Sequence, residues 1–246
     1  EIERIAAFML TERGLDTTVK LNPTLLGPDT VRGLLNDRLG FDAEVPDEAF
    51  AHDPTWDQAC DLIRSLEGVA TKAGRSFGVK LTNTLECRNK RGVFPDSEPM
   101  NYLSGRALHP ISVRTAARMQ AAMGGTLDIS FAGGADAGNV PPLVAAGLSP
   151  VTVCSDLLRP GGFQRLHQYL DNLAGAMSAA GAATLDHFIV SSAAGADDEI
   201  AAAALANLEA YAEQVAGHRA YQSRTFPDRT IKTDRPLGAF DCIAAP

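Results

Sequence analysis

The chain has 246 residues, which is enough for one large α/β domain or for a domain with an appendage. Hydrophobic residues make up 45% and charged residues 21%, a balance typical of a globular protein with a sizeable core. The formal net charge of -8 repels phosphate backbones and argues against a nucleic-acid partner, and no apolar run reaches the roughly 20 residues that a membrane-spanning helix needs.

Short β-rich runs alternate with helical stretches along most of the chain. In chain order, the apolar spacing predicts a helix over residues 2–13, a strand over 17–21, a helix over 29–39, a short candidate strand over 41–45, a helix over 55–72, a strand over 77–81, a helix over 112–123, a strand over 127–131, a helix over 139–146, a strand over 151–153, a helix over 162–179, a linker over 182–195 and a helix over 198–216. Strands joined by single helices run parallel, because the crossover helix returns the chain to the same end of the sheet. The pattern leaves two architectures, an open doubly wound sheet or a closed barrel, and both place their chemistry at the carboxyl ends of the strands.

Two of the predicted strands carry a lysine inside an apolar run and end in polar residues. Lys20 lies in the run Val-Lys-Leu-Asn, and Lys80 lies in the run Val-Lys-Leu-Thr. Burying a lysine without a partner costs several kcal/mol, so either the ammonium groups face an anion or an electron-rich ring, or the lysines point outward from two-faced strands. Asn22, Asn83 and Thr84 follow these strands and offer groups that suit a planar carbonyl or amide ligand. The alternative is that they form turns or cap the next helices.

Gly133 and Gly134 follow an apolar strand and precede a predicted helix. Glycines at such a turn leave backbone N–H groups uncovered, so they fit a phosphate at the helix N-terminus, or a tight turn without a ligand. The next strand runs into Ser155 and Asp156, and barrel enzymes often hold a phosphate between their last two strand-end loops. The GxGxxG fingerprint is absent, which disfavours a Rossmann fold.

The cysteines and histidines indicate no metal site in this chain. Four cysteines are scattered along it: Cys60, Cys87, Cys154 and Cys242. They form no CxxC pair and have no histidine at metal-ligand spacing, so we expect free thiols in a reducing cytoplasm. We interpret His52 and Asp53 as part of a helix N-cap.

Together these segments resemble the flavin-binding barrel of the dihydroorotate and dihydropyrimidine dehydrogenase superfamily. The matching features, which occur in the family order, are residues 19–23 (Val-Lys-Leu-Asn-Pro), 83–84 (Asn-Thr), 103–110 (Leu-Ser-Gly-Arg-Ala-Leu-His-Pro), 133–134 (Gly-Gly) and 151–156 (Val-Thr-Val-Cys-Ser-Asp). A bacterial subfamily of large iron–sulfur flavoprotein subunits, labelled selenate reductase or glutamate-synthase-like oxidoreductase, is most similar over three longer runs: residues 19–27 (Val-Lys-Leu-Asn-Pro-Thr-Leu-Leu-Gly), 78–85 (Gly-Val-Lys-Leu-Thr-Asn-Thr-Leu) and 156–162 (Asp-Leu-Leu-Arg-Pro-Gly-Gly). The resemblance covers about residues 1–246.

The resemblance implies an α/β fold, namely the C-terminal portion of a (β/α) TIM-type barrel over residues 1–195. The chain changes character from about residue 196, so we interpret residues 196–246 as a helical appendage and a linker toward an iron–sulfur region outside this chain. The family's proton-transfer residue precedes the region that matches Glu1, so we expect no catalytic residue in this chain, and the isolated segment is expected to be inactive.

The resemblance also implies FMN as the cofactor. It places Lys20 against the flavin ring, and it directs Asn83 and Thr84 toward the substrate or the flavin edge. Together with Asn22, these are the residues that we assign to a small planar substrate. The residues implied around the phosphate are Gly105, Gly133, Gly134, Ser155 and Asp156. The acidic Asp156 departs from this pattern unless it points away from the phosphate or caps the next helix. Iron–sulfur clusters and FAD are expected only outside the segment.

These observations favour an FMN-dependent module that passes electrons to other redox domains or subunits. One alternative is a flavin-free barrel that docks redox modules, and it is favoured if Lys20 points away from the strand-end rim. Another is an aldolase-like barrel in which Lys20 or Lys80 forms a Schiff base, which needs a desolvated lysine. Part of a barrel also has an unpaired sheet edge, so we expect a homodimer or coverage of that edge by the C-terminal segment.

Overall fold

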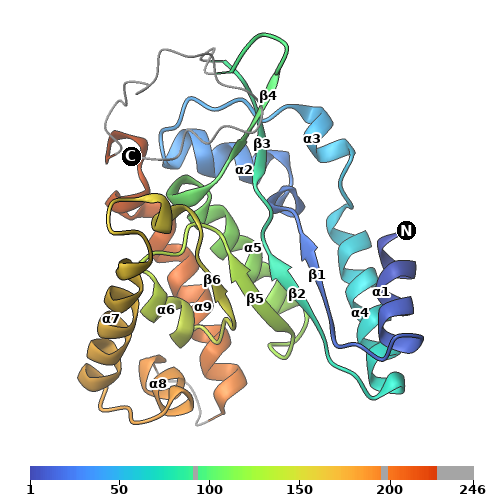
Figure 1. The fold of residues 1–246 in the computed structure, drawn as a ribbon, viewed down its shortest axis with the longest axis vertical. Helices are drawn as coiled ribbons and strands as arrows, with labels where there is room; N and C mark the ends of the chain where they lie inside the picture. Colours follow the sequence, from blue (N-terminus) through green and yellow to red (C-terminus); the bar gives the residue numbers. More distant parts are fainter. Residues whose placement is uncertain (91–93, 195–198, 226–246) are drawn as a thin grey trace.

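The computed structural model describes residues 1–90, 94–194 and 199–225. Its centre is a parallel four-stranded sheet in the order β1 (Thr17–Leu21), β2 (Phe77–Leu81), β5 (Asp128–Ala132) and β6 (Val151–Thr152) (Figure 1). A separate antiparallel hairpin of β3 (Leu85–Arg88) and β4 (Met100–Leu103) lies beyond the end of β2, at the top of Figure 1. The strands predicted at residues 17–21 and 77–81 are confirmed. The strand predicted at 127–131 lies one residue later, and the strand predicted at 151–153 ends one residue earlier.

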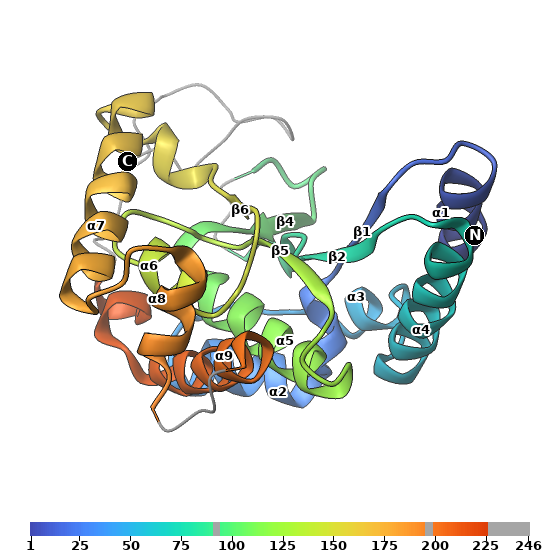
Figure 2. The same ribbon diagram turned by 90° about the horizontal axis from the view of Figure 1, so that it is seen from below.

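The helices cover one face and the flanks of this sheet. In chain order they are α1 (Ile2–Thr11), α2 (Pro28–Arg32), α3 (Asp47–Ala51), α4 (Trp56–Ala73), α5 (His109–Ala122), α6 (Val140–Ala145), α7 (Leu166–Ala179), α8 (Leu185–Ser192) and α9 (Ile200–Gly217). Figure 2 shows α1 and α4 at one flank, α7 at the other, and α5 and α9 beneath the middle of the sheet. A π-helical turn, Gly33–Arg38, continues α2.

The helix α4 shows how the sequence sets these elements. Thr55 and Gln58 form a capping box at its start, and Gly74 ends it in the left-handed conformation at φ 61°. Apolar residues at helical spacing face the core: Ala59, Cys60, Ile63, Leu66 and Ala70 are buried. Burial of this face, together with the two caps, fixes both the extent and the rotation of the helix.

The strands are two-faced, as their alternation requires. Several apolar side chains are buried on the helix-covered face: Val19, Leu21, Val79, Leu81, Ile129 and Phe131. The register pairs Lys20 with Lys80 and Lys80 with Ser130, so these three residues share the opposite face, which we call the lysine face.

The order of the strands decides between the two architectures. A doubly wound sheet reverses its strand order at a switch point and carries helices on both faces. In the described chain, strands are added in one direction and the helix layer lies against one face. This is the arrangement of part of a (β/α) barrel, and the doubly wound alternative is wrong.

Three predicted features differ from the structure. Residues 41–45 form no strand and lead instead into α3. The segment 182–195, predicted as a linker, contains α8, which Thr184 caps by accepting the N–H of His187 at 3.2 Å. The hairpin escaped prediction because its strands, Leu-Glu-Cys-Arg and Met-Asn-Tyr-Leu, mix apolar with polar residues and form no apolar run.

The helix expected to belong to an appendage shares the core with the sheet. α9 packs along α5, and much of its length is buried: Ala203, Ala204, Leu208, Tyr211, Ala212, Val215 and Ala216. The division of the chain at residue 195 stays a prediction. Residues 226–246, the expected linker, lie outside the described residues.

Candidate functional site

Polar side chains gather where β1 and β2 end. Asn22 follows β1, and Asn83 and Thr84 follow β2; all three line a cavity of about 260 Å³. The α3 segment and the hairpin supply most of its other lining residues: Thr24, Ala49, His52, Asp53, Glu86 and Tyr102. The structure thus brings together the three residues that we assign to substrate binding, and that role stays a prediction.

Hydrogen bonds connect the polar residues of this cavity. Asn22 Nδ2 donates to Asp53 Oδ1 at 2.5 Å, and the hydroxyl of Thr24 donates to the other carboxylate oxygen of Asp53. Asn83 Nδ2 donates to Asn22 Oδ1 at 2.6 Å. The two strand ends are therefore tied to each other and to the segment after α3, which rigidifies this side of the rim.

The interpretation of Asp53 as a helix cap is wrong. Thr55 caps α4, since its Oγ1 accepts the N–H of Gln58 at 3.3 Å and Gln58 Oε1 accepts the N–H of Thr55 at 3.0 Å. His52 ends α3. Asp53 lies between the two helices, where its carboxylate is available to Asn22 and Thr24.

Both strand lysines lie on the lysine face, away from the core. Lys20 is exposed, and Lys80 Nζ donates to Thr152 Oγ1 on β6 at 2.7 Å. In a closed barrel the face opposite the helices lines the interior. A lysine that points away from the helix-packed core points toward the interior of a closed barrel. The lysines can therefore lie on the polar face of a two-faced strand and still face a ligand.

The residues predicted around a phosphate meet at the ends of β5 and β6, in a cluster that we call the glycine corner: Gly105, Gly133, Gly134 and Ser155. A Cβ on Gly134 would lie 2.2 Å from the carbonyl oxygen of Gly105, and a Cβ on Gly105 would lie 3.5 Å from the side chain of Ser155. A Cβ on Gly133 would lie 2.3 Å from Ser112 Oγ. These close approaches explain the glycines without a ligand, so phosphate binding at the corner stays a prediction.

Asp156 is held by cationic side chains beside the corner. Arg165 donates to both carboxylate oxygens at 3.0 Å, Arg159 donates at 3.3 Å, and the Tyr169 hydroxyl donates as well. Burial raises the pKa of Asp156, but the hydrogen bonds from Arg165 and Tyr169 and the two arginine charges outweigh it and hold the pKa below its usual range. The carboxylate is thereby neutralised, and two guanidinium groups are held at the residue that follows Ser155.

A buried histidine connects the corner to α9. His109 Nδ1 lies 2.7 Å from the carbonyl oxygen of Gly133, and Nε2 lies 2.8 Å from the hydroxyl of Tyr211. Its ring also stacks on Tyr221, with centroids 4.9 Å apart. Burial lowers the pKa of His109 to about 4, so the ring is neutral at pH 7. Because a carbonyl only accepts, Nδ1 carries the proton and Nε2 accepts from Tyr211.

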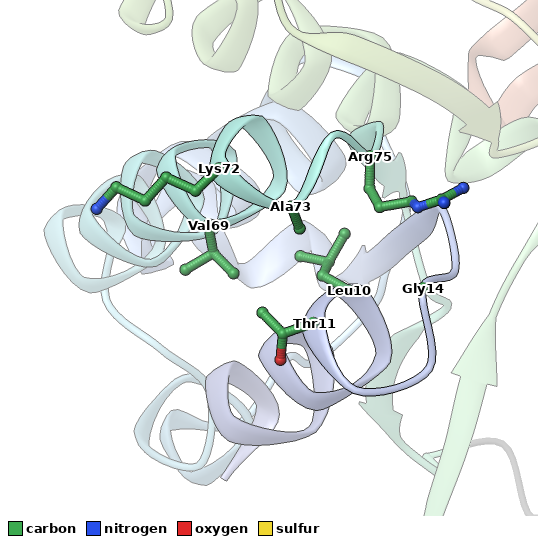
Figure 3. A pocket seen from close by; sticks show the side chains of 7 residues that line it. All are labelled: Leu10, Thr11, Gly14, Val69, Lys72, Ala73 and Arg75. Atoms are coloured by element: carbon green, nitrogen blue, oxygen red, sulfur yellow. The ribbon is translucent and has the colours of Figure 1, made fainter.

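A larger cavity, of about 490 Å³, lies away from the strand-end rim. It is formed between the ends of α1 and α4 and the turns that lead into β1 and β2, as Figure 3 shows. Its lining residues are Leu10, Thr11, Gly14, Val69, Lys72, Ala73 and Arg75. The cavity lies at the amino ends of the strands, whereas the active sites of barrel enzymes lie at the carboxyl ends. We therefore assign no site to it.

Among the described residues, no helix is both long and apolar enough to cross a lipid bilayer. Cys60 and Cys87 are buried free thiols and Cys154 is an exposed one, whereas Cys242 lies outside the described residues.

Comparison with known proteins identifies relatives. The family model described as "Oxidoreductase YgfK, N-terminal TIM-barrel domain" matches residues 1–222. The protein YgfK of Escherichia coli strain K12, named as a candidate oxidoreductase, is 44% identical over 176 residues, which is 71% of this chain and 17% of that protein. YgfK of Escherichia coli O157:H7 matches to the same extent. The chain thus spans about a sixth of the length of these curated relatives.

One solved structure is also similar in part. The crystal structure of ligand-free DHODH from Eimeria tenella superposes with a TM-score of 0.38 and 25% sequence identity. The superposition covers 51% of this chain and 34% of that chain.

Proposed function

The chain belongs to the YgfK N-terminal TIM-barrel family of oxidoreductases, and from this premise we propose that its strand-end rim binds FMN and presents it to a small planar substrate. The observation that carries the proposal is the pairing in register of Lys20 and Lys80 on the face of the sheet that the helices leave open. Gly105, Gly134 and Ser155, from three different loops, meet at one corner of the rim of the same sheet, and the amide-lined cavity lies at the same end of it.

The donors at the glycine corner suit a phosphate. Ser155 supplies a hydroxyl, and glycines at a strand-end turn allow a phosphate to approach backbone N–H groups closely. Asp156, the residue after Ser155, holds the guanidinium groups of Arg159 and Arg165. Arg106, the residue after Gly105, is ion-paired with Asp136. Asp156 therefore supports the proposal indirectly, since it orients positive charge rather than contacting a phosphate itself.

The lysine face suits the ring of the same cofactor. FMN supplies hydride- and electron-transfer chemistry when it is bound. Lys20 and Lys80 are neighbours in register, so together they create a positive potential over the β1–β2 side of the sheet. A lysine at this position favours negative charge that develops on a bound ring, which is the role we assign to Lys20.

The cavity at the ends of β1 and β2 is assigned to the substrate. Asn22, Asn83 and Thr84 can bind a carbonyl- or amide-bearing molecule, and Tyr102 offers an exposed ring for stacking. The Schiff-base alternative is not favoured, because neither Lys20 nor Lys80 is buried in the described structure.

We further propose that this segment works within a longer, cytoplasmic redox protein of the selenate reductase or glutamate-synthase-like kind. Electrons would pass between FMN and iron–sulfur clusters or FAD held by other parts of the polypeptide or by partner subunits. The free thiols at Cys60, Cys87 and Cys154 fit a reducing compartment.

The test is to purify the full-length protein and separate its released flavins by chromatography. We expect about one FMN per polypeptide in the wild type. Lys20→Met should lower FMN retention by about tenfold, as expected for the loss of one charge-assisted contact. Lys72→Met, which removes a lysine at the opposite end of the strands, should leave it unchanged.

Two results would count against the proposal. FAD without FMN in the wild type would favour the flavin-free docking barrel. Equal FMN retention in the Lys20→Met and Lys72→Met proteins would remove Lys20 from the site.

A further inference from the structure

A chain of hydrogen bonds in the cavity links Thr24, Asp53, Asn22 and Asn83. In this chain the side chain of Asp53 can only accept hydrogen bonds. Its two oxygens accept from Asn22 Nδ2 and from the Thr24 hydroxyl. A carboxylate has no hydrogen to donate, so the amino group of the Asn22 side chain has to face Asp53. The orientation of the Asn22 amide is thus fixed by charge.

The orientation of Asn22 fixes that of Asn83 in turn. With its amino group toward Asp53, Asn22 presents its Oδ1 to Asn83, which must donate through Nδ2; the observed distance is 2.6 Å. The Oδ1 atom of Asn83 then remains as an acceptor that this chain of hydrogen bonds does not use. Within the described part of the chain it accepts no hydrogen bond, and Asn83 lines the cavity.

The other residues that line the cavity also favour ligands that donate hydrogen bonds. Glu86 contributes a second carboxylate, and none of the residues that line the cavity is a lysine or arginine. Such a site favours ligand groups that donate hydrogen bonds and disfavours anionic ones. The exposed Tyr102 ring, 65% accessible, favours a flat ligand.

We infer that Asp53 is a positioning residue that turns the Asn83 carbonyl into the cavity, so that the site selects a planar ligand with an N–H donor of the amide or amidine type. This rests on the proposed assignment of the cavity to the substrate. Asp53 acts through Asn22, and the specificity resides at Asn83.

The test uses benzamide as the N–H donor and methyl benzoate as its partner without one, with binding to the full-length protein measured by ligand-observed NMR. We expect benzamide to bind the wild type at least about fivefold more tightly, the size of one hydrogen bond. Equal binding of the two probes by the wild type would overturn the inference, whatever the variants do.

A swapped pair of variants separates positioning from general structure. Asp53→Asn lets the Asn22 amide turn either way, so the preference for benzamide should fall to about parity. The double variant Asp53→Asn/Asn22→Asp places the carboxylate at position 22, where it accepts from both neighbours and again leaves Asn83 Oδ1 toward the cavity. We expect the preference to return in this double variant.

Thermal unfolding of each variant and its FMN content are measured alongside. An unchanged preference in Asp53→Asn, or no recovery in a double variant that unfolds at the wild-type temperature, would overturn the inference. FMN content reports on the cofactor proposal independently, because Asp53 lies in the cavity at β1 and β2 and not at the glycine corner.

Discussion

Lys20 on β1 and Lys80 on β2 lie directly beside each other in register on neighbouring parallel strands, on the face opposite the core. Lys80 finds a partner in Thr152, whereas the ammonium group of Lys20 makes no ion pair with a described residue. Two like charges at paired positions disfavour the folded state slightly. The paired lysines therefore favour the binding of an anionic or electron-rich ligand and do not stabilise the fold.

This gives opposite expectations for stability and for binding. Without flavin, Lys20→Met should leave the free energy of unfolding unchanged or raise it by about 0.2–1 kcal/mol, because one of two like charges is removed. The same change should weaken FMN binding. Hydrogen exchange of the β1 and β2 peptides in flavin-stripped full-length protein measures the first effect, and a loss of protection there would contradict the prediction.

Gly134 should be intolerant of any side chain. Its φ is +66°, and an added Cβ would meet the Gly105 carbonyl oxygen at 2.2 Å, so Gly134→Ala combines backbone strain with a clash. We expect a loss of roughly 2 to 4 kcal/mol of local stability, read from hydrogen exchange in β5.

Gly74→Ala is the matched control for backbone strain alone. Gly74 has φ +61° and ψ 39°, in the left-handed region, and nothing lies within 4 Å of its added Cβ, so the cost should be only about 1 kcal/mol. Equal costs at the two positions would show that the corner is not closely packed.

The contact between α5 and α9 should weaken in acid through His109. Its pKa in the folded protein, about 4, lies below the ordinary value of 6.5, so the unfolded chain takes up a proton first as pH falls. The stabilisation is complete above pH 6.5 and decreases between pH 6.5 and 4, by about 1.4 kcal/mol per unit and about 3 kcal/mol in all. Hydrogen exchange of residues 109–122 and 200–217 across this range measures it.

His109→Gln serves as the control, since it keeps polar groups at the site but does not titrate. Its α5 and α9 peptides should lose much less protection between pH 6.5 and 4. A wild type whose protection is as insensitive to pH as that of the variant would contradict the role given to His109.

The outer edge of β1 should mediate self-association of the chain when it is expressed alone. Thr17 N–H bonds to the Ser76 carbonyl and the Leu21 carbonyl accepts from Asn83, so the backbone groups of Thr18 and Lys20 face the other way. Within the described residues this edge has no partner strand. Ile2, Ile5 and Phe8 on the neighbouring α1 are also exposed.

We expect a dimer in sedimentation and solution scattering, and Thr18→Pro should shift it toward monomer. Proline at this position removes an N–H from the open edge only and leaves the bonds to β2 in place. A monomeric wild-type chain would contradict the expectation.

Much of the sheet was predictable from the sequence, because its strands are short apolar runs bounded by polar turns. The helix α4 was predictable because apolar residues recur along it at helical spacing, and α9 because its segment is rich in alanine. The hairpin was not, because its strands mix apolar with polar and charged residues, and α8 was not, because its 8 residues span only about two turns.

The site was predictable only where residues follow a strand. Asn22, Asn83 and Thr84 could be grouped because parallel strands end at one edge. Asp53 could not, since its partners Asn22 and Thr24 lie 31 and 29 residues earlier and the sequence around it also suits a helix cap. Long-range side-chain contacts of this kind depend on the packing of α3 and leave no local pattern.

The rim can be examined most directly in a cryo-electron microscopy map of the full-length protein, at a resolution that shows ligands. FMN binding predicts density with its phosphate at Gly105, Gly134 and Ser155 and its ring over Lys20. A map with well-defined side chains at these positions and no flavin density between them, from protein that retains FMN elsewhere, would contradict it.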